Sequence, residues 1–315
     1  MMYSSFLLII GLVLLYLGGE ILIRGSVFIA IKARISKLVV GMTIVSFATS
    51  SPELFVSLEA IFSGSSDIVF GNIIGSNIAN IALVLGLTAI LFNINISSKT
   101  LKTDYPFLLF STILVGFILS YYNVISRLTG VVFLLILSAF LYYMVTKSRK
   151  DDNVLANESD KENDNSIFKS ISFLFFGILM LKFGADFLVS GAIDIANYFN
   201  VNERVIAVSV VAIGTSIPEL VTSIIAALKK EVDLAVGNIV GSNIFNLLAV
   251  LGTTALFKDI RITDANILSI DYWFMFLLTI IFGALIYFLP KGILNRAKGA
   301  LLFLIYIVYI YIIFK

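Results

Sequence analysis

Apolar residues occur along this chain in long runs that recur from end to end, with short polar stretches between them. A helix needs about 20 apolar residues to cross the hydrocarbon core of a bilayer. The pattern therefore predicts an all-α polytopic membrane protein with ten transmembrane helices. The predicted spans lie near residues 5–24, 38–62, 68–92, 105–122, 128–146, 167–189, 203–228, 234–257, 271–289 and 299–313.

A single long polar stretch, residues 147–166, separates two similar halves. When the chain is shifted by 166 residues, the halves align without a gap from Gly11 to Ile90, and 14 of 24 positions are identical between 67–90 and 233–256. The chain therefore divides into a five-helix repeat at 1–146, a short linker at 147–166 and a second five-helix repeat at 167–315. The most similar segments are 38–92 and 203–257.

An odd number of crossings in each repeat forces the second repeat to run upside down relative to the first. The distribution of lysine and arginine tests this prediction, because loops rich in these residues face the cytoplasm. With the N-terminus outside, inward segments carry sixteen basic residues and outward segments carry five. We therefore expect a multi-pass cell-membrane protein with both termini outside and the 147–166 linker in the cytoplasm. Inverted repeats are typical of secondary transporters, whose sites lie near the bilayer midplane.

The composition restricts the chemistry that the chain can carry out. The sequence is 59% hydrophobic and only 13% charged, and it contains neither cysteine nor histidine. Disulfides, thiol chemistry and zinc or haem ligation by these residues are excluded, which leaves oxygen as the ligand for any metal ion. An intramembrane hydrolase would need a catalytic dyad or a serine–histidine pair, and the sequence supplies neither. We therefore expect a protein that is not an enzyme and has no cofactor.

Polar residues inside the spans concentrate in the second and third helix of each repeat, beginning with a Thr-Ser-x-Pro-Glu segment. Proline lacks an N–H group and breaks the helix, so carbonyl groups before Pro52 and Pro218 lose their helix partners. In hydrocarbon this is tolerated only where other groups or a ligand satisfy them. Next to each break stand a carboxylate and two hydroxyl groups, which together suit a hard cation. These side chains are Thr49, Ser50 and Glu53 in the first repeat and Thr215, Ser216 and Glu219 in the second.

The following helix adds a polar stripe with a spacing of four residues, so its members share one face. The stripe is Asn72, Ser76 and Asn80 in the first repeat and Asn238, Ser242 and Asn246 in the second. Gly71 and Gly75 form a small-residue pair that would let another helix approach closely. Two such units that meet antiparallel would bring both glutamates and about eight side-chain oxygens to one centre, and we expect Asn72 and Asn238 to be among the metal ligands.

A structural explanation is available for some of these features. A lone proline in a membrane helix usually produces only a kink, and serine or threonine often bonds to its own helix. An ionisable residue in the middle of a span is different, because it costs about 2.5–3.5 kcal/mol to insert and indicates function by default. Glu53 and Glu219 are a matched pair with the same polar neighbours. We therefore interpret them as functional.

At these segments the sequence resembles the cation/calcium exchanger superfamily, in particular its prokaryotic sodium/calcium exchanger branch. The motifs that carry the resemblance are T-S-x-P-E and G-N-x-x-G-S-N-x-x-N, and each occurs in both halves. The resemblance implies a Ca²⁺ site between the two glutamates, flanked by Na⁺ sites. The implied ligands are Thr49, Ser50, Glu53, Ser76, Asn80, Thr215, Ser216, Glu219, Ser242 and Asn246, together with the carbonyl groups of Ser46 and Ala212.

The sequence departs from the family pattern at two positions. Ala48 replaces the usual glycine before the first break, and Asn246 stands where potassium-dependent and several prokaryotic relatives have aspartate. An amide still offers an oxygen but carries no charge, so the centre would hold two carboxylates. This similarity to the potassium-independent exchangers argues against potassium co-transport.

These features predict a secondary active antiporter that exchanges Ca²⁺ for Na⁺ by alternating access. We expect the first and sixth spans, which carry few polar groups at mid-depth, to slide against a core of eight helices.

A proton/calcium exchanger that uses the same glutamates as proton carriers is the alternative. A channel is a third possibility, which strict dependence on a cation on the opposite side would exclude. The expected partners are these ions and the lipid bilayer, with no nucleic acid and no obligatory protein partner.

Overall fold

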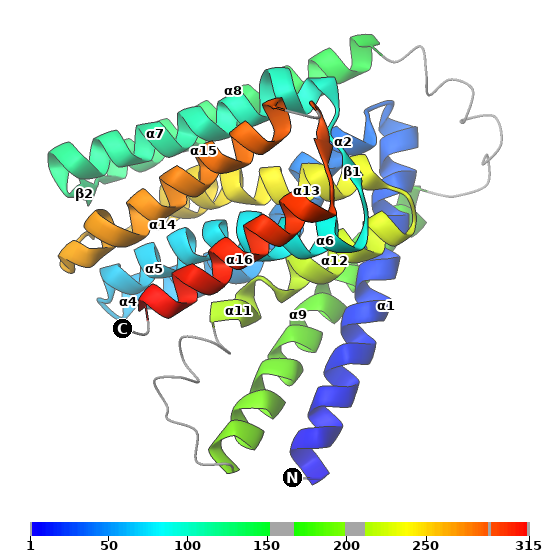
Figure 1. The fold of residues 1–315 in the computed structure, drawn as a ribbon, viewed down its shortest axis with the longest axis horizontal. Helices are drawn as coiled ribbons and strands as arrows, with labels where there is room; N and C mark the ends of the chain where they lie inside the picture. Colours follow the sequence, from blue (N-terminus) through cyan, green and yellow to red (C-terminus); the bar gives the residue numbers. More distant parts are fainter. Residues whose placement is uncertain (1, 152–166, 199–211, 289–290, 314–315) are drawn as a thin grey trace.

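The structure is a computed structural model that describes residues 2–151, 167–198, 212–288 and 291–313 (Figure 1). These ranges are all-α apart from four two-residue strands. The first half contains α1 (Met2–Ala33), α2 (Lys37–Val40), the π-helical η1 (Gly41–Val45), α3 (Ser46–Thr49), α4 (Ser51–Phe62), α5 (Ser66–Ile78), the π-helical η2 (Ala79–Leu85), α6 (Gly86–Leu91), β1 (Ile94–Asn95), the π-helical η3 (Thr100–Asp104), α7 (Tyr105–Tyr122), β2 (Val124–Ile125) and α8 (Arg127–Asp151).

The second half repeats much of this order. It contains α9 (Ile167–Tyr198), α11 (Ala212–Thr215), α12 (Ile217–Leu228), α13 (Val232–Phe245), the π-helical η6 (Asn246–Val250), α14 (Leu251–Phe257), β3 (Ile260–Arg261), the π-helical η7 (Ile267–Tyr272), α15 (Trp273–Tyr287), β4 (Ile293–Leu294) and α16 (Arg296–Ile313).

The described residues contain eight helices long and apolar enough to cross a membrane, or nine when the bent pair Lys37–Thr49 and Ser51–Phe62 is taken as one span. The prediction of an all-α polytopic membrane fold is therefore confirmed. Of the predicted seventh span, 203–228, residues 203–211 lie outside the described ranges, and the described part ends in the shorter apolar helix α12. Several observed helices are longer than predicted, because hydropathy detects only the apolar part of a helix; α1, for example, continues through Arg24 and Lys32 to Ala33.

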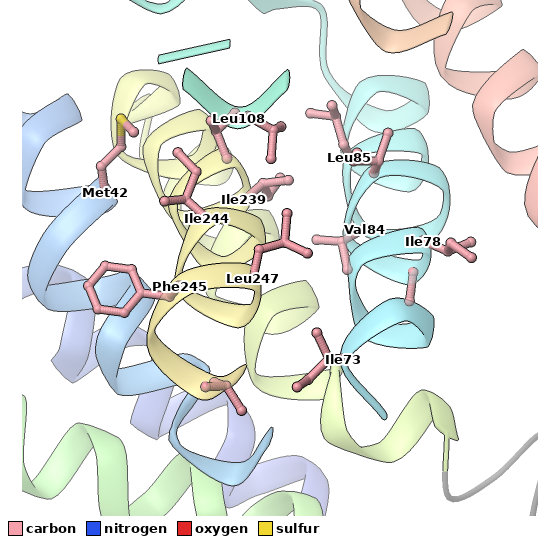
Figure 2. Close-up of a cluster of buried hydrophobic side chains, with 14 of the residues drawn as sticks. Met42, Ile73, Ile78, Val84, Leu85, Leu108, Ile239, Ile244, Phe245 and Leu247 are labelled. Carbon is pink, nitrogen blue, oxygen red and sulfur yellow. The ribbon is translucent and has the colours of Figure 1, made fainter. Parts of the chain in front are cut away.

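Two of the spanning helices form the centre of the molecule. Of their most apolar stretches, 83% is buried in Ser66–Leu91 and 94% in Val232–Phe257, whereas no other span exceeds 39%. A cluster of apolar, fully enclosed side chains lies between parts of these two central helices (Figure 2). Val84 and Leu85 come from the first helix, and Ile239 and Leu247 come from the second. The outer helices α7, α8 and α16 instead expose large apolar side chains, as lipid contact requires.

Helices α1 and α9 pack side by side over their length and run at a steep angle to the bundle formed by α7, α8 and α15 (Figure 1). Glycines make this close contact possible. A Cβ atom on Gly11 would lie 2.8 Å from the carbonyl oxygen of Gly184, and one on Gly18 would lie 3.0 Å from that of Gly177. Since only glycine leaves room for backbone at this distance, the two helices form one tightly packed pair.

Contacts between the two halves occur in matching pairs. The hydroxyl of Tyr105 donates to the carbonyl of Thr279 at 3.2 Å, and that of Tyr272 donates to the carbonyl of Thr112 at 2.9 Å. Tyr105 and Tyr272 are 167 residues apart, as are Thr112 and Thr279. Strand β1 likewise pairs antiparallel with β4, and β2 with β3. In these contacts, each half therefore pairs with the other half in the same way.

Candidate functional site

The chain breaks at the same place in both halves. Between Lys37–Thr49 and Ser51–Phe62 the helix axis bends by 42°, with φ −85° and ψ 4° at Ser50. Ser216 has nearly the same backbone angles, φ −91° and ψ 2°, before α12. Pro52 and Pro218 lie in the first turn of the helices that follow. A proline is compatible with the first turn, so the local geometry follows directly from the sequence.

Glu53 and Glu219 lie in the first turns of α4 and α12, and both are fully buried. The Glu219 carboxylate accepts a hydrogen bond from the Ser50 hydroxyl of the first repeat at 3.4 Å. Both carboxylate oxygens of Glu53 and the second oxygen of Glu219 have no hydrogen-bond partner in the described part of the chain. None of the ion pairs found there involves either glutamate. Each glutamate is thus a buried acidic group that no basic side chain in the described ranges neutralises.

The hydroxyls before the first break are bonded to α13. Thr49 donates to the Asn238 side-chain oxygen at 3.0 Å and lies 3.3 Å from the Ser242 hydroxyl. Ser46 donates to the Asn238 carbonyl at 2.9 Å. At Ser46 and Thr49 the first repeat is therefore packed directly against α13.

A glycine crossing makes this closure possible. A Cβ atom on Gly237 would lie 2.5 Å from the Leu38 carbonyl oxygen, and one on Gly41 would lie 2.6 Å from that of Leu234. A Cβ atom added to Gly71 or Gly75 would have no described atom within 4 Å outside its own stretch of helix. The segment that matches Gly41, residues 203–211, lies outside the described ranges, so the predicted close approach at Gly71 and Gly75 is not tested.

The first asparagine of each stripe joins its helix to the preceding one. Asn72 donates to the backbone carbonyl of Glu53 and to the Ser57 hydroxyl, both at 3.0 Å. Asn238 donates to the Ser223 hydroxyl at 3.5 Å, and its oxygen accepts from Thr49. Both were predicted as ligands. The structure shows that their amide nitrogens fix the helices that carry the glutamates.

The last asparagine of each stripe lies at the centre, in a π-helical segment, a distortion that is frequent at functional sites. Both amide atoms of Asn80, the side-chain oxygen of Asn246 and the Ser216 hydroxyl are buried and have no hydrogen-bond partner within the described ranges. Ser76, four residues before Asn80 in the stripe, is also buried. These side chains add neutral oxygens around the two carboxylates.

The two remaining predicted site residues, Thr215 and Ala212, belong to α11. Thr215 is partly exposed and lines the cleft described next, and Ala212 begins the helix. The described residues contain no group of three or more acidic, histidine or cysteine side chains that could hold a metal ion. A cation bound between the glutamates would therefore take its other ligands from neutral oxygens.

A cleft of about 440 Å³ lies beside the broken helices, next to Pro52 and Thr215. Its lining includes Pro52, Val56, Glu59, Lys182, Asp186 and Thr215, from α4, α9 and α11. The matching face on the other side is closed: Gly19 of α1 packs against Val221 and Ile225 of α12, and Glu20 pairs with Lys229 at 3.1 Å. The chain is therefore asymmetric although its sequence is repeated.

Sequence reasoning did not select Asn77 and Asn243 as functional residues. Both are buried at the centre, and the oxygen of Asn77 accepts a hydrogen bond from the Asn246 amide at 3.1 Å. They occur in the repeated Gly-Ser-Asn motif, which was the available signal. Their position one residue beyond Ser76 and Ser242 takes them off the four-residue stripe.

Secondary transporters typically combine a multi-pass helical fold, broken helices and a buried polar centre, and this chain has all three features. The family described as "Sodium/calcium exchanger protein" matches residues 3–146 and 169–315 of the chain. The chain therefore belongs to the sodium/calcium exchanger family, as the sequence predicted, and is a transporter and not an enzyme.

Individual relatives cover the whole chain. It is 36% identical to a putative antiporter, CaxA, of Alkalimonas amylolytica, over 100% of both chains. It is 28% identical to the sodium/calcium exchanger MaX1 of Methanosarcina acetivorans, over 98% of this chain and 97% of that one. A structure of the sodium-calcium exchanger NCX_Mj, soaked with zero Na⁺ and Ca²⁺, matches with a TM-score of 0.84 and 28% identity over 99% of both chains.

Proposed function

We propose that the protein exchanges Ca²⁺ for Na⁺ by alternating access at a midplane site formed by Glu53 and Glu219. The main support is the set of buried carboxylate and amide oxygens that have no partner in the described chain. A charge removed from water without compensation is heavily penalised, so the two carboxylates need cations. Ca²⁺ prefers six to eight oxygen ligands, which the surrounding hydroxyls and amides supply. The names of MaX1 and NCX_Mj point to the same pair of ions.

The remaining ligands in this proposal come from both repeats. They are Thr49, Ser50, Ser76, Asn80, Thr215, Ser216, Ser242 and Asn246, with the carbonyls of Ser46 and Ala212, while Asn72 and Asn238 hold the helices in place. One Ca²⁺ or several Na⁺ would neutralise the glutamates. An empty centre with two negative charges would be costly to occlude, so the protein would change sides only when it is loaded.

The proposed architecture is ten spans in two inverted five-helix repeats, 1–146 and 167–315, with the second and seventh spans broken. The repeated sequence, the paired tyrosine contacts and the matched breaks at Ser50 and Ser216 support this arrangement. The distribution of basic residues supports an orientation with both termini outside and the 147–166 linker in the cytoplasm. In this orientation the cleft opens to the outside.

The asymmetry of the two halves supports alternating access. Gly19 and Glu20 of α1 are packed onto α12, whereas the matching residues of α9, Ala185 and Asp186, line the cleft beside α4. In the opposite state, α9 would close onto α4 and α1 would leave α12. The α1–α9 pair would thus slide against the remaining helices, and the Glu20–Lys229 ion pair would break.

The exchange itself is tested with purified protein in proteoliposomes. We expect Ca²⁺ uptake driven by an outward Na⁺ gradient and no uptake driven by a pH gradient alone. The physical reason is that the site offers hard neutral oxygens beside the carboxylates, which suit Na⁺ as well as Ca²⁺. Uptake driven by the pH gradient but not by Na⁺ would overturn the sodium assignment and identify a proton/calcium exchanger.

The one-sided cleft gives a second prediction, and the lack of native cysteine makes its test free of background. Val56 lines the cleft, whereas its counterpart Thr222 is fully buried. We expect Val56→Cys to react with a membrane-impermeant thiol reagent added outside intact cells and Thr222→Cys to remain unlabelled. Equal labelling of both variants, or labelling of Val56→Cys only from the cytoplasm, would contradict the proposed state and orientation.

A further inference from the structure

Asn77 in α5 and Asn243 in α13 occupy the contact between the two central helices, and both are fully enclosed. The side-chain nitrogen of Asn77 donates to the backbone carbonyl of Asn243 at 3.3 Å. A carbonyl can only accept a hydrogen bond, so this contact fixes which end of the Asn77 carboxamide is nitrogen. The oxygen of Asn77 therefore points the other way.

At that position the Asn77 oxygen accepts the side-chain nitrogen of Asn246 at 3.1 Å. An oxygen cannot donate, so the Asn246 carboxamide is held with its nitrogen toward Asn77. Its own oxygen is left at the opposite end, buried and without a partner in the described ranges. A chain of three groups thus determines which atom Asn246 offers to the centre.

We propose that Asn77 is a positioning residue that keeps the Asn246 oxygen directed at the transported cation. This inference rests on the proposed function, because it assumes that Asn246 is a cation ligand. A carboxamide has a donor end and an acceptor end of nearly equal size, and packing alone does not distinguish them. If the group were reversed, two N–H protons would face the cation. Groups that orient metal ligands typically contribute about 10- to 100-fold to affinity.

In the described residues, the matching asparagines of the other half do not form these hydrogen bonds. Asn243, the counterpart of Asn77, donates its side-chain nitrogen to the Ile239 carbonyl in its own helix at 2.8 Å. Neither amide atom of Asn80, the counterpart of Asn246, has a partner in the described part of the chain. The orientation is therefore fixed at Asn246 and not at Asn80. Asn243 acts on Asn77 only through its backbone, which every substitution retains.

The test measures the effect of Asn77→Leu on reconstituted Na⁺/Ca²⁺ exchange. We expect Asn77→Leu to raise the KM for Ca²⁺ at least roughly tenfold with a nearly unchanged maximal rate. An unchanged KM in Asn77→Leu would overturn the inference. If Asn77→Leu does not fold, Asn77→Ser, which shortens the side chain away from both partners, replaces it.

A substitution at Asn246 provides the decisive test. A carboxylate has an oxygen at both ends and cannot be misoriented, so in an Asn246→Asp background Asn77→Leu is expected to alter the KM less than about twofold. A tenfold effect that persists in this background would show that Asn77 acts through general packing and would refute the inference. Asn246→Leu tests whether Asn246 is a cation ligand separately from whether Asn77 positions it. An unchanged KM in Asn246→Leu would remove Asn246 from the proposed site, whereas a raised KM there with a silent Asn77→Leu would reject only the positioning role.

Discussion

Glu53→Gln and Glu219→Gln are each expected to lower sodium-driven Ca²⁺ exchange by at least about 100-fold. Glutamine keeps the size of the side chain but removes one of the two negative charges that the described chain leaves uncompensated. Removing one partner from a buried charged interaction costs about 3–5 kcal/mol, and every 1.4 kcal/mol is a factor of about ten in an equilibrium constant. The affinity for the divalent ion should fall more steeply than that for Na⁺, because two charges are needed to balance Ca²⁺.

The measurement is Ca²⁺ flux in proteoliposomes together with Ca²⁺ binding in detergent. Glu231→Gln is the matched control, because Glu231 pairs with Lys37 at 3.0 Å at the end of α13 and is partly exposed. We expect this variant to retain most of the exchange activity. Exchange that survives in either Glu53→Gln or Glu219→Gln would rule out the proposed site.

Gly237→Leu is expected to prevent correct folding. Even the first carbon of a side chain at this position would meet the Leu38 carbonyl oxygen at 2.5 Å, and backbone atoms cannot move aside as a flexible side chain can. Overpacking a well-filled core costs about 1–3 kcal/mol or more. Here it would also separate Ser46 from the Asn238 carbonyl, which lies 2.9 Å from its hydroxyl.

The readout is the yield of monodisperse protein and its Tm in detergent. Ala300→Leu supplies the control, since it is also a change from a small residue to leucine in a helix but at an exposed position of α16. We expect near-normal yield for Ala300→Leu and a severe loss for Gly237→Leu. A stable Gly237→Leu protein with normal exchange would show that the helices separate here more easily than the contact implies.

The sequence was sufficient to predict the membrane class, the family and the positions of most helices. Long apolar runs determine a spanning helix because hydrocarbon allows few alternatives. Helix ends were less well predicted, as α1 shows, since a helix continues past the bilayer wherever its residues allow it. The π-helical segments at Asn80 and Asn246 were not predicted, because they depend on how neighbouring helices pack.

For the site, the matched Pro-Glu segments predicted a centre shared by both repeats, and in the structure Ser50 of the first repeat lies 3.4 Å from the Glu219 carboxylate of the second. The sequence could not show how the halves differ. The cleft beside Thr215 and the closure at Thr49 come from one arrangement of a nearly symmetric chain, and a repeated sequence is compatible with either arrangement. The direction of the amides of Asn77 and Asn246 depends on contacts between the repeats, which a motif does not encode.

The backbone contact between α1 and α9 has a consequence for the efficiency of transport. One helix comes from each half, and Gly11 and Gly184 let the two backbones pack in direct contact, so we expect the pair to move together. Under the proposed mechanism the two helices move as one rigid body. Opening the ion site to one side of the membrane therefore requires closing it to the other side. Slippage, in which ions run down their gradient without exchange, would need both sides open at once. A helix pair that moves as one rigid body excludes a site open to both sides at once. The free energy of one ion gradient is then conserved in the other gradient.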